Sequence, residues 1–213
     1  MADQRSDKEG TAGRSAASTK KTGIFLHLKL FLFLNLLGQG ITCSTFYYGY
    51  HYGDFIPVPT ALDMSTRLAF ALRCSLPLAL FLFIAVALVG NKRSVTDAMN
   101  PLSGNEQIVQ IDKNFLANTL EQSVIGFILM LVVASYAETP KELRLLPIFA
   151  VVFTVARVVF RIGYGFHYVL RTPGMAANIA CNYVLIGVAL YSLATKGLHM
   201  QLYTTTIPDK TEL

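Results

Sequence analysis

Three polar residues share one face of an apolar segment near the middle of the chain. Asn114, Asn118 and Glu121 are spaced at i, i+4 and i+7, so in a helix they lie one above another. An ionised carboxylate inside an apolar span is costly unless it is paired or faces a wet cavity. Glu121 is therefore a candidate functional residue, and the two amides beside it add hydrogen-bonding groups.

The next apolar segment carries a longer stripe with three cationic side chains. Its members fall at i, i+4, i+7, i+11 and i+14: Arg157, Arg161, Tyr164, Tyr168 and Arg171. A structural interpretation is that Glu121 neutralises one arginine inside a helical bundle, while the tyrosines anchor the membrane interface. The functional interpretation starts from the charge imbalance, because one carboxylate cannot compensate three guanidinium groups. A small anion from solution would then complete the site.

The composition places these stripes in a membrane. Hydrophobic residues make up 53% of the 213 residues and charged residues only 15%, whereas about 25% are charged in an ordinary soluble domain. The apolar residues are grouped in runs of about 20, the length that crosses a hydrocarbon core. This excludes a soluble enzyme and predicts a polytopic membrane protein. The net charge of +5 lies mostly at the ends of these runs, so it does not indicate nucleic-acid binding, and the three cysteines lack metal-ligand spacing.

Polar connections divide the chain into four parts. We predict a disordered cytosolic tail at 1–22, an N-terminal anchor helix and aromatic loop at 23–65, a four-helix bundle at 66–196 and a C-terminal tail at 197–213. The expected spans are 24–42, 66–90, 114–136, 146–166 and 174–195. Short connections between spans favour antiparallel neighbours. The predicted fold class is all-α integral membrane: an up-down four-helix transmembrane bundle preceded by an extra N-terminal transmembrane helix.

The first apolar run has a second interpretation as a cleaved signal peptide. Lys29 lies within the run and the polar lead is long for a signal sequence, which favours a retained anchor. With five spans and a cytosolic N-terminus, nine basic residues fall on the inner side and four on the outer side, as the positive-inside rule requires. The tail, the 91–113 connection and the turn at Arg171 would then share the cytosolic face.

The two stripes together resemble a signature of the MAPEG superfamily, the membrane-associated proteins of eicosanoid and glutathione metabolism. Asn118-Thr119-Leu120-Glu121 is followed on the next span by Arg157-x-x-Phe160-x-x-Gly163-Tyr164-x6-Arg171. The resemblance covers roughly residues 66–195. It implies a four-helix protomer of MAPEG type that assembles as a homotrimer and binds glutathione between subunits near the cytosolic face.

The resemblance also implies roles for individual residues. Asn118 and Glu121 would hold the peptide part of glutathione, with Glu121 meeting its amino group, while Arg157 and Tyr164 would contact it from the adjacent protomer. Arg171 matches the arginine that stabilises the glutathione thiolate and is the catalytic candidate. Asn114 and Arg161 complete the predicted cofactor-binding set. Such a protein would act as a glutathione-dependent transferase, peroxidase or isomerase on a lipophilic small molecule entering from membrane lipid.

Several positions depart from the family pattern and leave enzymatic activity open. Asn114 stands where glutathione-using members carry arginine, Gln122 where several carry tyrosine, and Phe160 where some carry tyrosine or histidine. Lys113, Lys92 and Arg93 are candidate substitutes on the same face. The anchor helix, polar tail and aromatic loop resemble the mattrin branch of the family, which implies the alternative of a non-catalytic membrane scaffold in vesicle trafficking or membrane homeostasis. Either function places the protein in endomembranes, in the endoplasmic reticulum or in Golgi and lysosomal membranes.

Overall fold

The structure is a computed structural model that describes residues 3–100, 102, 104–167 and 169–198. Throughout this part of the chain the regular elements are helices and no strand occurs. The principal helices are α1 (Asp3–Tyr52), α2 (Met64–Cys74), α3 (Leu76–Ser94), α4 (Gln110–Tyr136), α5 (Pro140–Leu143), α6 (Leu145–Phe166) and α7 (Thr172–Lys196). Two short 3-10 helices, η1 (Asp97–Met99) and η2 (Glu106–Val109), lie between α3 and α4.

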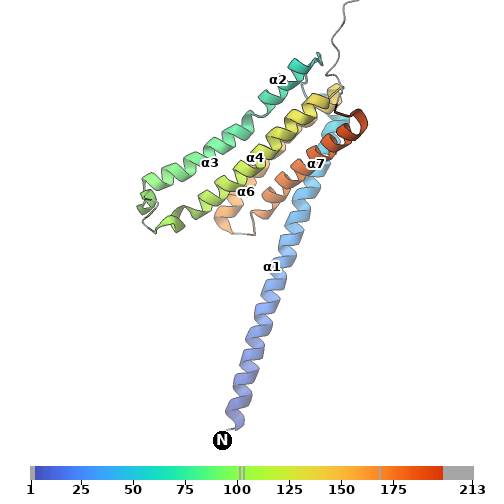
Figure 1. Cartoon of the computed structure of the whole chain (residues 1–213). Coiled ribbons are helices and arrows are strands. Elements are labelled where there is room, and N and C mark those ends of the chain that lie inside the picture. Colours follow the sequence, from blue (N-terminus) through green and yellow to red (C-terminus); the bar gives the residue numbers. More distant parts are fainter. Residues whose placement is uncertain (1–2, 101, 103, 168, 199–213) are drawn as a thin grey trace, which may run out of the picture.

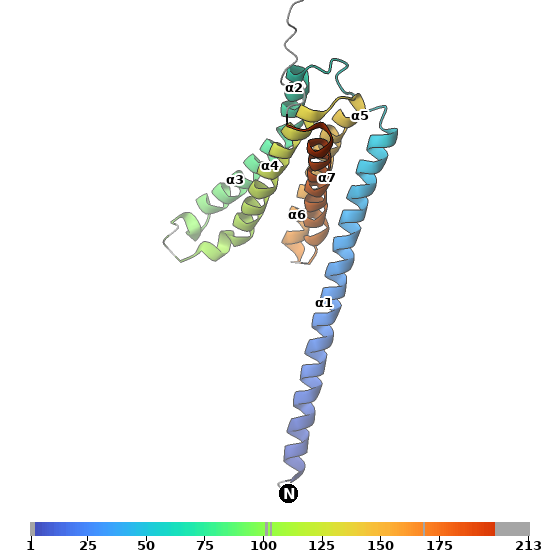
Figure 2. The ribbon, with the colours of Figure 1, turned by 45° about the vertical axis from the view of Figure 1, so that its right-hand side comes forward.

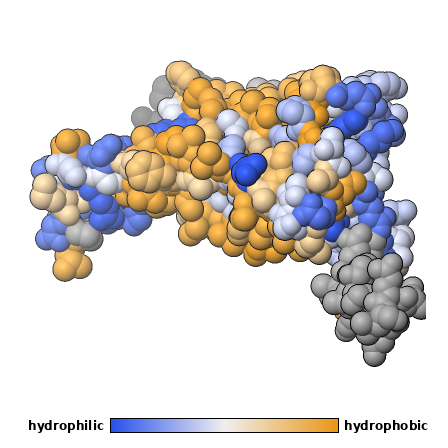
Figure 3. Space-filling model, turned by 90° about the horizontal axis from the view of Figure 1, so that it is seen from above, coloured by the Kyte–Doolittle hydropathy of each residue, from blue (hydrophilic) through white to orange (hydrophobic). Residues whose placement is uncertain are grey.

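Five helical stretches of the described chain are long and apolar enough to cross a membrane. They are His27–Tyr52, Met64–Ser94, Glu106–Tyr136, Pro140–Phe166 and Thr172–Lys196. The prediction of a multi-pass membrane protein with one span ahead of four is therefore confirmed. Apolar side chains cover much of the visible surface of the bundle, as helices that face hydrocarbon require (Figure 3).

The four later spans run side by side with alternating direction, and α1 lies along α7 (Figures 1 and 2). This confirms the predicted up-down bundle with an added N-terminal helix. The N-terminus, the connection between α3 and α4, and the turn between α6 and α7 are found at one end of the molecule (Figure 1). This grouping agrees with the expected topology, while the side of the membrane on which this end lies stays a prediction.

Helix α1 is longer than the sequence analysis predicts at both ends. Residues 3–22, expected to form a disordered tail, continue α1 as helix. Alanine, lysine and arginine recur there and have high helix propensity. The aromatic segment 46–52, expected to be a loop, is also helical. Its rings contact one another at i, i+4, as in Tyr47 and His51, whose tilted rings have centroids 4.6 Å apart. The connection therefore begins only at Gly53.

The second span is broken where the sequence analysis predicts one continuous helix. The backbone changes direction between α2 and α3 at Ser75, two residues before Pro77. Proline lacks the N–H that would continue the α2 hydrogen-bond ladder, and its ring clashes with the preceding turn.

At the other end of α2, the Asp63 carboxylate accepts hydrogen bonds from the Ser65 hydroxyl and the Thr66 amide, which hold the pKa of Asp63 well below its usual range.

Helices α4, α6 and α7 form the packed centre that positions the polar stripes. Phe149, Phe153, Met130 and Leu185 are buried in one apolar cluster that these helices share. Helix α7 approaches α6 closely at Gly174, where an added Cβ would overlap the backbone of Ala156 and Phe160. Because backbone cannot move aside as a flexible side chain can, the close contact depends on glycine.

Replacing Gly174 by alanine is therefore expected to destabilise the bundle by about 1–3 kcal/mol through overpacking. Gly187 is the matched control, because it lies on the same helix and an added Cβ there meets nothing within 4 Å. Gly187→Ala is expected to leave stability unchanged or raise it by up to about 1 kcal/mol through helix propensity. Thermal unfolding in detergent measures both, and equal midpoints for the two variants would contradict the close-packing argument.

Candidate functional site

The polar stripes of α4 and α6 face each other within one chain. Arg157 Nη1 on α6 donates a hydrogen bond to Asn118 Oδ1 on α4 at 2.8 Å. One turn or more toward the α3–α4 end, Asn114 Nδ2 donates to the Tyr164 hydroxyl at 2.9 Å. The helical spacing that places each stripe on one face therefore also brings the two stripes together. These contacts lie within the protomer, although the family resemblance places Arg157 and Tyr164 against a ligand held by the adjacent subunit.

Arg157 is fully buried between aromatic rings. Its guanidinium carbon lies 5.4 Å from the centroid of Phe153 and 5.3 Å from that of Phe160. Its Nε and Nη2 atoms have no hydrogen-bond partner among the described residues. The hydrogen bond to Asn118 fixes which way that amide points, because the oxygen is occupied and the NH2 group remains as a donor. Arg157 thus holds the Asn118 side chain in one orientation.

Asn114 has both ends of its amide engaged. Its oxygen accepts from Gln110 Nε2 at 2.9 Å, and its nitrogen donates to Tyr164. The Tyr164 hydroxyl accepts that bond and keeps its own proton to donate. Asn114 therefore orients Tyr164, whereas an arginine at this position would offer a cation.

Arg161 pairs with an acid that the sequence analysis does not single out. Arg161 Nη2 lies 2.6 Å from Asp112 Oδ1, and Lys92 Nζ lies 3.1 Å from Asp112 Oδ2. Asp112 is buried and compensates cations from two other helices. Glu121 is the one carboxylate set against the cationic stripe in the sequence analysis, so the actual surplus of positive charge is smaller than expected there. A signal for Asp112 does exist, since Asp112, Phe115 and Thr119 share the buried face of α4 at i, i+3 and i+7.

The basic residues suggested as substitutes for the missing arginine are occupied as well. Lys92 is held by Asp112, while Arg93 Nη2 and Lys113 Nζ lie 2.8 Å and 2.6 Å from the two oxygens of Glu106. These three ion pairs join η2 and the start of α4 to the end of α3. In this structure they therefore stabilise the connection between two spans.

A groove of about 280 Å³ opens between α4, α6 and α7. Its lining includes five positions of the two stripes and their surroundings: Asn114, Asn118, Glu121, Phe160 and Arg171. Glu121 forms no ion pair with Arg157, Arg161 or Arg171 in the described chain, which argues against the structural interpretation in which it neutralises one of them. The Arg171 guanidinium lies over the Tyr164 ring, 4.6 Å from its centroid.

This arrangement places opposite charges on the wall of one groove. The Glu121 side chain is exposed, Arg171 is half-buried, and Asn118 is half-buried with its NH2 group available to donate. Arg161 does not line the groove. Tyr168, expected within the same stripe, and the C-terminal tail from residue 199 lie outside the described residues.

Two of the residues that depart from the family pattern make well-defined contacts. Gln122 Oε1 accepts a hydrogen bond from Asn182 Nδ2 on α7 at 2.8 Å, so it links two helices. Phe160 lines the groove and stacks on Phe115, with ring centroids 5.8 Å apart. Neither position offers a hydroxyl to the groove.

The fold and the groove define a class: multi-pass membrane proteins built on a four-helix bundle, with a polar, charged groove between the spans. Within this class, the sequence profile of the MAPEG family matches residues 71–191, more than half of the chain. The chain belongs to the MAPEG family, which confirms the resemblance. No curated protein and no solved structure matches the chain significantly.

Proposed function

We propose that the protein binds glutathione in the groove between α4, α6 and α7 and acts as a glutathione-dependent transferase or peroxidase. The observation that carries the proposal is the presence of a carboxylate and a guanidinium, Glu121 and Arg171, on one groove wall without a mutual ion pair. Glutathione carries an ammonium group, two carboxylates and a thiol. A wall with one acid, one cation and an amide complements those groups.

Each groove residue has a distinct task in this proposal. Glu121 binds the ammonium group, and the Asn118 NH2 group donates to a carboxylate or peptide oxygen. Bound glutathione supplies a thiol nucleophile. The Arg171 guanidinium favours the thiolate form by placing positive charge near the sulfur, and the Tyr164 ring holds that guanidinium in place. A lipophilic electrophile would reach the groove from membrane lipid.

The remaining site residues support these groups. Arg157 orients Asn118, Asn114 orients Tyr164, and the pair formed by Arg161 and Asp112 fixes α6 against α4. In a homotrimer, which the family favours, a neighbouring subunit would cover the open side of the groove. We place the protein in an endomembrane, endoplasmic reticulum or Golgi and lysosomal membrane, with the N-terminus in the cytosol.

A mattrin-like scaffold is the second candidate function, and the packing of α1 favours it. Helix α1 makes an extensive contact with α7, and an added Cβ at Gly38 would collide with the carbonyl of Pro173. The added helix is thus built into the bundle beside the turn that carries Arg171. In this second function the bundle assembles but catalyses no reaction, and α1 and the tail bind partners in vesicle trafficking.

Glutathione binding distinguishes the two candidates. At ten times its Kd, glutathione should stabilise the detergent-solubilised protein by about 1.4 kcal/mol, which raises the melting temperature by a few degrees. Glu121→Gln removes the charge that meets the ammonium group and should weaken binding about tenfold or more. Glu138→Gln, at the opposite end of the bundle, should retain the wild-type shift. No shift at millimolar glutathione in an assembled wild-type protein would favour the scaffold.

A further inference from the structure

A second groove lies at the other end of α7, where α1 and the α5–α6 corner meet it. Its volume is about 370 Å³. Phe46, Leu145, Val184 and Val188 form an apolar inner part. The groove extends along α1 from Cys43 to His51, which corresponds to about 12 Å of helix. These residues belong to the spans, so the inner part lies at the depth of lipid chains, where an empty apolar space would lose its dispersion contacts.

The outer part of the groove is aromatic. The rings of Tyr47 and His51 on α1 are tilted against each other with centroids 4.6 Å apart, and Tyr50 meets His51 edge to face at 5.1 Å. Tyr191 of α7 closes the opposite side of the groove. It lies on the same helical face as Val184 and Val188, at i+7 where these are at i and i+4. Tyr47 and Tyr191 are 57% and 70% exposed in the described chain, so their ring faces are accessible to a ligand. Such electron-rich faces attract cations, quaternary ammonium groups above all.

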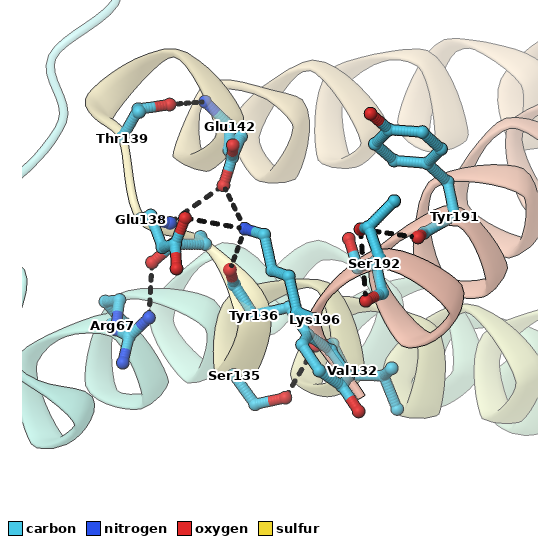
Figure 4. Close-up of polar contacts among 12 residues, drawn as sticks. Arg67, Val132, Ser135, Tyr136, Glu138, Thr139, Glu142, Tyr191, Ser192 and Lys196 are labelled. Atoms are coloured by element: carbon cyan, nitrogen blue, oxygen red, sulfur yellow. Dashed lines mark hydrogen bonds and ion pairs between the residues drawn. The ribbon is translucent and has the colours of Figure 1, made fainter. Parts of the chain in front are cut away.

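At the charged end of the groove, the lysine that lines it is fully engaged. Lys196 Nζ lies 2.8 Å from the Tyr136 carbonyl oxygen, 3.2 Å from Glu138 Oε2 and 3.5 Å from Glu142 Oε2 (Figure 4). These three oxygens match the three N–H donors of an ammonium group. Lys196 therefore has no donor left for an anionic headgroup. Arg67, whose Nη1 donates to the Ala137 carbonyl beside Glu138, is a second cation of this cluster, so two carboxylates and two cations balance there.

From this gradient we propose that the groove is a binding site for a choline-headed phospholipid. An acyl chain fills the apolar inner part along Phe46 and Val188. The choline group lies among the rings of Tyr47, His51 and Tyr191, beside Glu142. Tyrosine hydroxyls at the edge can donate to the phosphodiester. A general preference of tyrosine for membrane interfaces explains exposed rings, but it does not explain why the four aromatic residues of the outer part border one groove whose lysine has no free donor.

The test compares lipids that share their chains and differ in headgroup. Full-length protein in a neutral detergent is incubated with dioleoylphosphatidylcholine or dioleoylphosphatidylglycerol, and bound lipid is counted by native mass spectrometry. Wild type should retain the choline lipid about fivefold better, the preference expected of one favourable cation–π site. Tyr191→Leu should abolish the preference, whereas Tyr183→Leu should keep it. Tyr183 is the matched control because it is 66% exposed on the same helix and does not line the groove.

A second variant tests the inner part separately. Val188→Trp should fill the apolar space and reduce retention of both lipids, provided that the thermal midpoint shows a folded protein. The proposal is overturned if wild type retains the two lipids equally, or if a folded Val188→Trp protein binds the choline lipid as wild type does. Equal loss of preference in Tyr191→Leu and Tyr183→Leu would also overturn it, because the effect would then belong to exposed tyrosines in general.

Discussion

Arg171→Ala should remove the ultraviolet absorbance of the glutathione thiolate and lower glutathione-dependent activity about a hundredfold or more, the usual cost of losing a charge-stabilising donor. Arg171 lines the groove and lies 4.6 Å from the Tyr164 ring centroid, so its charge is held at the groove wall. A nearby cation lowers the pKa of a bound thiol because it favours the charged form. Without the guanidinium that pKa rises toward its solution value, and the thiolate fraction at neutral pH falls.

Two further variants separate charge from general disruption. Arg171→Lys keeps a positive charge but loses the planar group that stacks on Tyr164, so we expect partial thiolate formation. Arg73→Ala is the control, because Arg73 is an exposed arginine of α2 that does not line the groove. A titration of thiolate absorbance against pH measures all three proteins. If Arg171→Ala titrates at the same pH as wild type, Arg171 does not stabilise the thiolate.

Sequence alone predicts the features that depend on local periodicity. Runs of apolar residues give the five spans, and the i, i+4, i+7 spacing of Asn114, Asn118 and Glu121 places them on one face of α4. The motif that joins this stripe to Arg157 and Arg171 also predicts the family, which the match over residues 71–191 confirms. These patterns can be recognised in the sequence because each depends on residue spacing within a helix or between consecutive spans.

Features that depend on how helices rotate against each other are not readable in this way. The pairing of Asp112 with Arg161 joins residues 49 positions apart, and the hydrogen bond between Gln122 and Asn182 joins residues 60 apart. Nothing local in the sequence specifies either partner. The aromatic segment of α1 illustrates a different difficulty, since tyrosines suit both an interfacial loop and a helix end, and packing of Gly49 against Ile148 accompanies the helix.

Arg157 offers the sharpest separation of function from stability. Arg157→Met removes a fully buried guanidinium whose Nε and Nη2 lack partners among the described residues, and replaces it with an apolar chain that suits Phe153 and Phe160. Removing such a buried charge is often neutral or stabilising. The cost is an unpaired Asn118 Oδ1, which belongs to a half-buried side chain and therefore costs less than the about 1–3 kcal/mol of a fully buried acceptor. We therefore expect a folded protein with a modestly lower melting temperature that no longer responds to glutathione, because Asn118 is free to turn.

The double variant Arg157→Met with Asn118→Leu completes this test. It removes both partners of the hydrogen bond, so neither polar group is left unsatisfied and the melting temperature should return toward the wild-type value. The response to glutathione should stay absent, since the donor to the ligand is gone. Thermal unfolding with and without glutathione gives both quantities in one experiment. A double variant that fails to recover stability would show that Arg157 holds the bundle together, and a preserved glutathione shift would show that Asn118 does not bind the tripeptide.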